Sequence, residues 1–411
     1  MIMANIRLAA KAISASKWRS FMTMTGIIVG VASVVTTVSL GEGVKKQVVD
    51  QINQLGQEVV TVSAGQTVTR DDQGNITGIN VLGNFSTSTL SEKDFADLQS
   101  TPNLASISPI SSISGKLQVD GSSSKSNVLI LATNEQIPNL LKQKLEYGSF
   151  FDATELDKKY IVLGKNVAEQ LFGEPSPIGK TLKIRDHDFI IRGVFEQFQS
   201  TVLSSGIDYN NTVFIPFNTG KQIMNVQAIS IAKIIMRTKP STDLKIFAAA
   251  VDKALLLNHG GQQDYTVLRQ DENLKVANTL LTGLTTGIAA IAGISLLVGG
   301  IGIMNIMLFT VSERTKEIGI RKAIGATNRQ IANQFLTESV MLSLLGGTLG
   351  VLLSLTANLL MRLFTTSLKP VISAPIIIAS IIVSTAIGVF FGVTPALKAA
   401  RKDPIQALRR E

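Results

Sequence analysis

The sequence predicts a membrane protein in which four transmembrane α-helices, arranged as one plus three, flank a large α+β extracytoplasmic domain made of two subdomains. The composition is 45% hydrophobic and only 17% charged, which is typical of a membrane protein. The charges also leave uncharged stretches of 22, 37, 23 and 28 residues, which begin after Arg19, Lys275, Glu338 and Lys369. Each stretch can hold the roughly 20 apolar residues that a helix needs to cross the hydrocarbon core, whereas buried helices of soluble proteins usually stop at about 10 to 14.

The first 41 residues are expected to enter the membrane once. Residues 1–19 carry Arg7 and Lys11 at helical spacing, followed by Trp18, which predicts an amphipathic helix on the inner leaflet with Trp18 as interfacial anchor. A short cytoplasmic extension of the first span is an equally open interpretation. Residues 20–41 are interpreted as a retained span and not as a signal peptide, because the apolar stretch is long and no clear small-residue cleavage site follows it.

Lysine and arginine residues beside the spans predict the orientation. They precede the first span, fill the turn between the second and third, and follow the fourth. Because the positive-inside rule places such segments in the cytoplasm, we expect a multi-pass protein of the cell membrane with both termini cytoplasmic. Residues 42–278 and a short loop at 365–374 are then outside. The net charge of +9 is a topology signal and gives no reason to expect nucleic-acid binding.

The extracytoplasmic part, residues 42–278, is long enough to bury its own core without disulfides, and the chain has no cysteine. Ser91 is expected to cap a helix, and residues 67–89 are expected to form a flexible loop. The mixed order of helical and strand-like runs predicts one subdomain at about 111–221, inserted into another at about 42–110 and 222–278. The expected strands are 58–63, 116–119, 127–132, 160–163, 181–184, 189–194, 212–215 and 233–237, and the expected helices are 134–144, 166–172 and 242–257.

The sequence offers little for catalysis, so we expect no catalytic, cofactor-binding or metal-binding residues and no enzyme activity in this chain. His187 and His259 are the only histidines. Acidic neighbours at ligand spacing accompany neither of them, and both are expected to be solvated. Residues 173–181 resemble a phosphate-binding loop, but five residues separate the two glycines where the motif has four. A turn into a strand is favoured there.

The second span, expected at 279–311, lies in an uncharged stretch that would measure about 55 Å as one helix, well beyond a hydrocarbon core of about 30 Å. It is therefore expected to continue out of the membrane as a stalk. A cytoplasmic segment at 312–334 follows it. After that segment we expect spans at 335–364 and 375–397 and a cytoplasmic tail at 398–411.

The segment at 312–334 alternates charged and apolar residues, so a helix there would have one charged and one apolar face. Gly325 can end this helix with a positive φ angle. One interpretation is a solvated connector, and the other is a rigid lever that passes motion from a cytoplasmic partner into the neighbouring spans. The residues expected to form the lever are Glu313, Arg314, Lys316, Glu317, Ile318, Gly319, Arg321, Lys322, Gly325 and Ala326.

Glycines in the spans provide small faces where helices can approach closely, as in pairs four residues apart. Ordinary glycine content of membrane helices is the alternative interpretation. The glycines expected at helix contacts are Gly26, Gly30, Gly299, Gly300, Gly302, Gly346 and Gly350. Glu338, near the inner end of the third span, is expected to make an interfacial hydrogen bond and not to take part in transport.

Residues 313–326 read ERTKEIGIRKAIGA, which resembles the motif E-R-T-x-E-I-G-I-R-x-A-x-G-A of the FtsX-like permease subunits of ABC transporters, and within them the MacB type. The likeness continues at 18–30, at 162–172, and in the closing PALKAARKDPIQALR at 395–409, so it spans nearly the whole chain. Ser149 departs from the family, which often has arginine at that position.

The resemblance implies a homodimer of this chain and two cytoplasmic ABC ATPase subunits, expected as separate polypeptides, that dock against the lever residues. ATP and Mg would be used by the ATPases, and this chain would bind no cofactor directly. ATP-driven motion would pass along the spans to the extracytoplasmic domain, which would export an amphiphilic drug-like or peptide substrate. An extracytoplasmic adaptor or membrane-fusion protein and the lipid bilayer are further expected partners, and no nucleic acid is expected. In the alternative, the same motion activates an extracellular hydrolase or a sensor.

Overall fold

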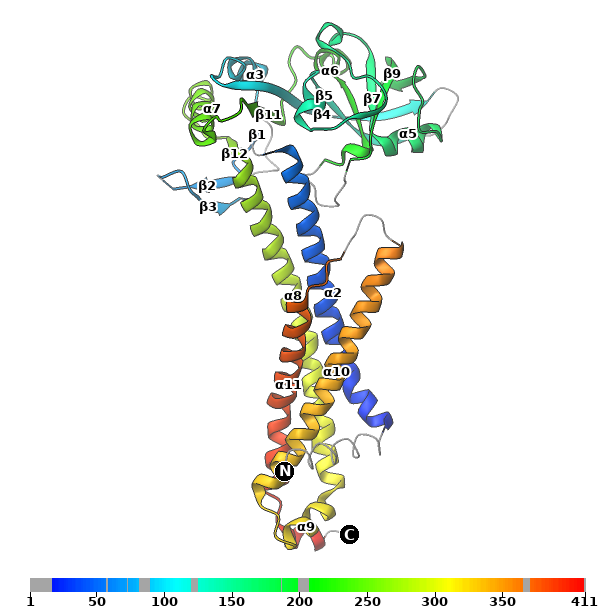
Figure 1. Ribbon diagram of the computed structural model, residues 1–411, viewed down its shortest axis with the longest axis vertical. Coiled ribbons are helices and arrows are strands. Elements are labelled where there is room, and N and C mark those ends of the chain that lie inside the picture. Colours follow the sequence, from blue (N-terminus) through cyan, green and yellow to red (C-terminus); the bar gives the residue numbers. More distant parts are fainter. Residues whose placement is uncertain are drawn as a thin grey trace. The chain divides into compact units, whose positions relative to one another are not determined.

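The computed structural model describes residues 17–56, 58–71, 73–80, 89–119, 125–185, 187–198, 207–364 and 370–409. The chain divides into a helical unit, Met1–Lys45 with Leu280–Glu411, and a sheet domain, Lys46–Thr279 (Figure 1). The amphipathic helix expected at 1–19 lies outside the described residues as far as residue 16. Residues 17–19 open the first long helix.

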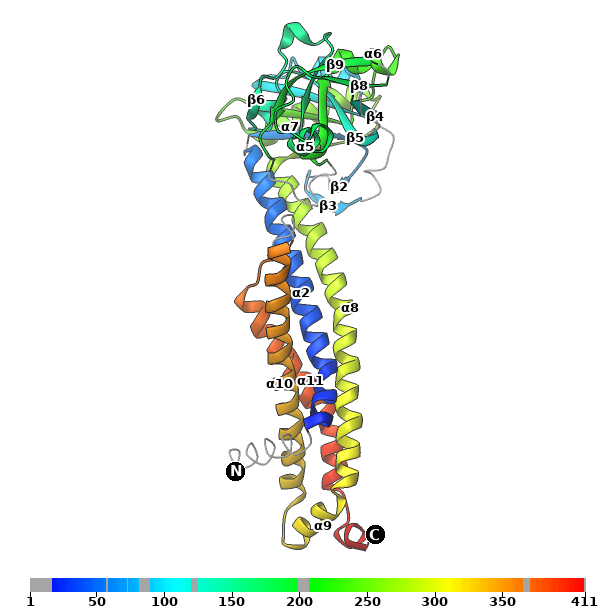
Figure 2. The ribbon, with the colours of Figure 1, turned by 90° about the vertical axis from the view of Figure 1, so that its right-hand side faces the viewer.

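Within the described residues, four helices are long and apolar enough to cross a membrane, which confirms the four spans predicted from the charge gaps. They are α2 (Lys17–Leu55), α8 (Gln270–Glu313), α10 (Asn328–Phe364) and α11 (Ala374–Ala400). The 44 residues of α8 measure about 66 Å at 1.5 Å per residue. Figure 2 shows α2 and α8 each as one unbroken helix, and each contributes residues to both units.

The sheet domain is built on a mixed sheet in the order β12-β1-β11-β4-β5-β10-β7-β9-β6, with β8 paired to β4 and β9. Most pairs are antiparallel, whereas β10 runs parallel to β5 and β7 runs parallel to β9. The strands are β1 (Val59–Ala64), β4 (Leu104–Val119), β5 (Lys125–Thr133), β6 (Leu145–Gly148), β7 (Tyr160–Leu163), β8 (Thr181–Ile184), β9 (His187–Phe195), β10 (Thr212–Pro216), β11 (Lys233–Thr238) and β12 (Tyr265–Arg269).

Strand β4 is 16 residues long and changes its partner part of the way along. From Leu104 to Ile110 it pairs with β11, and from Ser111 to Gln118 it pairs with β5. The parts expected at 42–110 and 111–221 therefore share this strand, and the sheet runs through both of them without a break.

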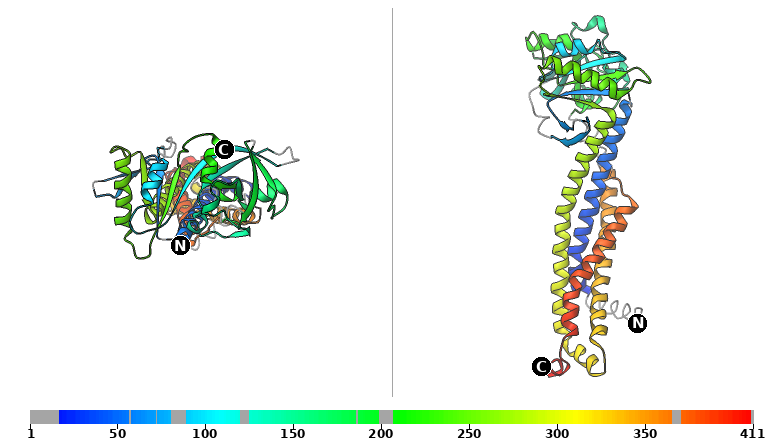
Figure 3. Two further views of the ribbon diagram at one scale, coloured as in Figure 1. Left: turned by 90° about the horizontal axis from the view of Figure 1, so that it is seen from above. Right: turned by 90° about the vertical axis from the view of Figure 1, so that its left-hand side faces the viewer.

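Alternate residues along the strands face two separate hydrophobic cores. Val60 and Val213 lie in the core covered by four helices, and α7 lies alongside the β12–β1 end of the sheet in Figures 1 and 3. Val59 and Phe214 lie in the other core, with the short helix α4 (Ile137–Leu140). The four covering helices are α3 (Glu92–Leu98), α5 (Lys165–Phe172), α6 (Phe217–Met224) and α7 (Leu244–Asn258).

Two local predictions of secondary structure are wrong. The loop expected at 67–89 contains a hairpin, β2 (Val68–Arg70) and β3 (Ile76–Ile79), because the Asp71 carboxylate accepts hydrogen bonds from the backbone N–H groups of Gln73 and Asn75 and so closes the turn; residues 81–88 lie outside the described residues. The helix expected at 134–144 is limited to α4, since Lys142 follows it with a φ angle of +50° that a helix cannot hold.

Ser91 caps α3 as predicted, in a reciprocal arrangement with Asp94. The Asp94 N–H donates to Ser91 Oγ at 3.3 Å, and the Ser91 N–H donates to Asp94 Oδ2 at 2.8 Å. The expectation that His259 is solvated is wrong, because its side chain is only 8% exposed and lies between two carboxylates. Nδ1 is 2.5 Å from Asp264 Oδ1, and Nε2 is 3.2 Å from Asp94 Oδ2.

Candidate functional site

The turn between α8 and α10 holds the lever residues predicted from the sequence. Helix α8 ends at Glu313, Arg314 has the non-helical angles φ −88° and ψ 17°, and α9 (Thr315–Ala323) begins directly afterwards. Thr315 Oγ1 donates to two of the last carbonyls of α8, 3.0 Å from Val311 O and 2.8 Å from Ser312 O. Gly325 then has a φ angle of +102°, as expected for the residue that ends the helix.

One side of α9 is buried in the helical unit. Ile318 is fully buried and belongs to the same hydrophobic cluster as Val311, Phe335 and Ala399, which lie on α8, α10 and α11. Gly319 is buried beside it. Both were expected to act in coupling, and their burial means that they can act by anchoring α9 and not by direct contact with a partner.

Polar side chains tie this segment to the neighbouring helices. Arg314 lies 3.6 Å from the carboxylate of Glu338 on α10, so Glu338 takes part in an ion pair where a simple interfacial hydrogen bond was expected. Arg321 Nη1 donates to Gln334 Oε1 at 3.0 Å. Lys322 Nζ donates to the carbonyls of Ala400, at 2.5 Å, and Lys402, at 2.7 Å, which are left open where α11 ends.

The other side of α9 is open. We define the docking face as Lys316, Glu317, Ile320 and Ile324, all of which are exposed. Ile320 and Ile324 are 48% and 79% exposed, and the helical spacing of 316, 320 and 324 places the three side chains along one stripe. Neighbouring exposed apolar side chains rimmed by charged residues are a feature of surfaces that bind other proteins.

A groove lies between the ends of α8 and α11. Its volume is about 650 Å³. This groove was not predicted from the sequence. The three basic residues at the end of the fourth span were the one feature that could have pointed to it. The lining residues are Leu308, Val311, Ser312, Thr394, Leu397, Lys398, Arg401 and Lys402.

The predicted packing glycines bring helices into backbone contact at several points. A Cβ atom on Gly26 would lie 2.7 Å from the Cα atom of Gly299, so α2 and α8 meet backbone to backbone there. Gly30 lies against Leu296 of α8, and Gly346 and Gly350 of α10 lie against α2. An added Cβ atom would come within 3.0 Å of a neighbouring atom at Gly26, Gly30 and Gly350, and within 3.1 Å of the Ile27 side chain at Gly346, as expected where small residues let helices approach closely.

Gly300 and Gly302 differ from each other. Gly300 faces the Phe391 ring on α11, whereas a Cβ atom on Gly302 would have nothing within 4 Å. Gly302 therefore does not serve helix packing among the described residues of this chain.

A serine–glycine seam between α10 and α11 was not predicted from the sequence. Small residues repeat every fourth position on both helices, and Gly388 lies directly against Ser343 Oγ. This four-residue spacing was the signal that could have revealed the seam. The seam residues are Ser339, Ser343 and Gly347 on α10, and Ser384, Gly388 and Gly392 on α11.

Two family models match the chain. Residues 20–254 match the MacB-like periplasmic core domain, and residues 289–404 match the FtsX-like permease C-terminal domain. The macrolide export ATP-binding/permease proteins MacB of Neisseria gonorrhoeae and MacB 2 of Yersinia pestis are 32% and 36% identical to it, over 98% of this chain. The chain covers 60% and 58% of their lengths, or about three fifths of the relatives that it matches.

Solved structures also resemble parts of the chain. The periplasmic region of MacB from Actinobacillus actinomycetemcomitans is 18% identical with a TM-score of 0.45, covering 56% of this chain and 96% of that one. The extracellular domain of the ABC-type transporter YknZ from Gram-positive bacteria is 17% identical with a TM-score of 0.39, covering 51% of this chain and 99% of that one. On the family models and the identity across almost its whole length, this chain belongs to the MacB-like, FtsX-type family of ABC transporter permeases.

Proposed function

We propose that the chain is the transmembrane subunit of an ABC transporter and couples ATP hydrolysis by an ABC ATPase to movement of its sheet domain. The observation that carries the proposal is the two-sided construction of α9. Its docking face is open to a partner, whereas Ile318 and Lys322 hold its other side to the transmembrane helices. In this proposal ATP and Mg are used by the ATPase, and this chain transmits motion without catalysing a reaction.

The path of that motion follows from the connections of α9. A force applied to the docking face passes to α8 through Arg314, the single residue between the two helices. It passes to α10 through the side-chain contacts of Arg314 and Arg321, and to α11 through those of Lys322. Helix α8 then continues as one helix to Gln270, directly after β12 ends at Arg269. Because a continuous helix resists compression and bending, displacement at one end can reach the sheet domain.

The positive-inside rule orients this assembly with α9 and both termini in the cytoplasm and the sheet domain outside. We further propose that the transported material is an amphiphilic drug-like molecule or a peptide, moved by the sheet domain outside the membrane. The similarity to macrolide export ATP-binding/permease proteins supports an export role. A second copy of this chain completes the transporter, and an adaptor protein is a further proposed partner.

The docking face can be tested with Ile324→Asp. Ile324 is 79% exposed, so the change removes little packing, but it places a charge in the proposed interface. We expect the amount of ABC ATPase that copurifies with the tagged full chain to fall about tenfold, since truncating one central interface residue costs about 1–2 kcal/mol. Vanadate-sensitive ATP hydrolysis in the same preparation is expected to fall with it.

Leu257→Asp is the matched control, because Leu257 is 76% exposed on α7 in the sheet domain. It is expected to leave copurification unchanged. Glu317→Lys reverses a charge on the docking face and should behave like Ile324→Asp. Wild-type levels of ATPase in both docking-face variants would contradict the proposal. If deletion of the gene altered the export of no tested compound but caused a cell-wall or sensing defect, the signalling alternative would be favoured.

A further inference from the structure

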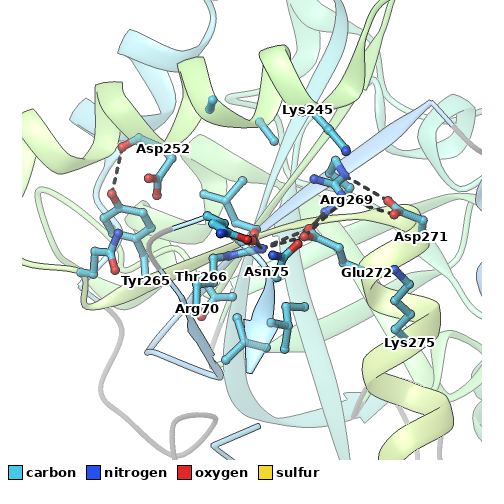
Figure 4. A pocket seen from close by; sticks show the side chains of 18 of the residues that line it. Arg70, Asn75, Lys245, Asp252, Tyr265, Thr266, Arg269, Asp271, Glu272 and Lys275 are labelled. Carbon is cyan, nitrogen blue, oxygen red and sulfur yellow. Dashed lines mark hydrogen bonds and ion pairs between the residues drawn. The ribbon is translucent and has the colours of Figure 1, made fainter. Parts of the chain in front are cut away.

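The sheet domain carries a groove that none of the steps above uses. It has a volume of about 560 Å³, within the range of about 300–1,000 Å³ typical of binding sites. One wall is α7, another is the β2–β3 hairpin, the floor is β12, and the first turns of α8 close one end (Figure 4). The alanines Ala248 and Ala249 face it from α7, and their small side chains leave the space open.

The floor of this groove is the free edge of the sheet. Among the strands that the structure describes, β12 is the end strand and pairs only with β1. In an antiparallel pair, each residue directs its N–H and C=O to one side, and alternate residues face opposite sides. The Ala64 N–H points away from β12, donating to Ala232 O at 3.2 Å. Its partner Tyr265, and Val267 two residues on, therefore direct their backbone groups into the groove.

Side chains already form hydrogen bonds with some of the backbone groups along this edge. The Val267 carbonyl accepts a hydrogen bond from Arg70 Nη2 at 2.8 Å, and the Arg269 N–H donates to Glu272 Oε2 at 3.0 Å. Unpaired strand edges are templates for further strands, and proteins often protect them with charged side chains. The hairpin residue Arg70 thus stands where the backbone of an added strand would lie.

The charged side chains in the groove differ in whether they form ion pairs. Glu272 makes a two-bond contact with Arg70, at 2.6 and 3.1 Å, and Asp271 makes one with Arg269, at 3.1 Å for both bonds. Lys245 and Lys275 also line the groove, and in the described part of the chain no carboxylate lies within ion-pair distance of either. The groove therefore presents two lysine cations to a ligand, while two of its own acids are occupied.

The two ends of the groove also differ in the charged groups that line them. Figure 4 shows Lys245 and Lys275 at the end where Arg269 pairs with Asp271, while Tyr265 lies at the other end. There the Tyr265 hydroxyl donates to the Asp252 carbonyl at 2.9 Å, and the Asp252 carboxylate lines the groove. An anionic group fits the lysine end, and a neutral or basic group fits the Asp252 end.

We propose that this groove binds an extended peptide segment of a partner protein, which adds to β12 as the next strand and places acidic side chains against Lys245 and Lys275. Main-chain hydrogen bonds to the Tyr265 and Val267 backbone supply affinity, and the lysines select the acidic sequence. The inference does not depend on ATPase coupling, since neither α9 nor nucleotide takes part in it.

The test uses the full chain in lipid nanodiscs and a fluorescein-labelled heptapeptide that alternates Glu and Val, read by fluorescence anisotropy without ATP. Saturable binding is expected, and the matched Lys–Val heptapeptide is expected not to bind. The double variant Lys245→Glu with Lys275→Glu should weaken binding of the Glu–Val peptide about tenfold or more, because two attractive charge contacts become repulsive. Lys253→Glu, on the same helix but outside the groove, should leave it unchanged.

Strand addition is tested separately by infrared spectroscopy of the Glu–Val peptide carrying ¹³C carbonyls. A shift of the labelled amide band to the β-strand position on binding supports the proposal. Binding without that shift, equal binding of the two peptides, or equal weakening by Lys253→Glu would each overturn it. Loss of ATPase copurification in the Ile324→Asp variant with peptide binding intact would separate the two proposals.

Discussion

Replacing Gly26 with leucine is expected to be among the most damaging single changes in the helical unit. The new Cβ atom would lie 2.7 Å from the Gly299 Cα atom, and backbone atoms on both sides cannot move aside as a side chain can. Overpacking of a core costs about 1–3 kcal/mol even where side chains can adjust, so we expect a loss of about 3 kcal/mol or more. Thermal unfolding of the purified chain in detergent, followed by helical circular dichroism, measures the effect.

Gly302→Leu is the control for this prediction, because it lies on the same helix as Gly299 but has open space in front of it. It is expected to leave the unfolding temperature nearly unchanged. Gly299→Leu, in contrast, should reproduce the Gly26→Leu loss. If Gly26→Leu unfolds at the wild-type temperature, then α2 and α8 do not cross at this point.

The second large effect is expected from Asp94→Ala in the sheet domain. The Asp94 carboxylate is buried and accepts hydrogen bonds from the Ser91 N–H and from Asn258, and it lies 3.2 Å from His259. Its loss removes the half of the capping box that Asp94 supplies to the Ser91 N–H, and leaves the buried partners unsatisfied at about 1–3 kcal/mol each. We expect the free energy of unfolding of the sheet domain to fall by about 3 kcal/mol.

Urea unfolding followed by tyrosine circular dichroism reports on this domain, because all four tyrosines lie within it. Asp188→Ala is the control: its contact with Lys183, at 3.9 Å, is exposed, and such surface pairs contribute about 0–1 kcal/mol. Equal losses in the two variants would show that the buried network around Asp94 contributes nothing beyond surface charge.

Asp94 also makes stability depend on pH in a defined direction. Burial alone would raise the pKa of Asp94, but hydrogen bonds from Ser91 and Asn258 and the charge of His259 outweigh it, so the pKa lies below its usual value. The stabilisation is therefore complete above the unfolded pKa of about 3.9 and is lost as the pH falls through the folded value. Below about pH 4, urea midpoints of wild type and Asp94→Asn should converge, and a constant difference down to pH 2 would contradict this account.

The transmembrane layout was predictable because charged side chains are rare in the hydrocarbon core. The uncharged gaps between Arg19 and Glu42 and between Lys275 and Glu313 therefore mark the first two spans. Gly325 and Ser91 were predictable for a similar reason, since helix ends have local requirements that single residues meet. The strands predicted at 160–163 and 181–184 coincide with β7 and β8, because short apolar runs bounded by turn residues usually form strands.

The features that sequence reasoning missed depend on contacts between distant residues. His259 is buried because Asp94 reaches it from 165 residues away, and its own polar neighbours gave no sign of this. The β2–β3 hairpin has a polar composition, yet Arg70 secures it to Glu272, 202 residues further along the chain. The burial of Ile318 likewise depends on three helices that surround it, so a local pattern could assign it to the lever but could not say which side it faced.

The long strand β4 has a consequence for how such proteins can be altered. Because its first half pairs with β11 and its second half with β5, the region at about 111–221 is not a cassette that can be exchanged at its sequence borders. A chimera joined at residues 110 and 111 would place the splice in the middle of a continuous strand, where a one-residue error in register turns every following side chain to the wrong face. Grafts that carry the whole of β4, from Leu104 to Val119, together with β5 and β11, are the ones expected to fold.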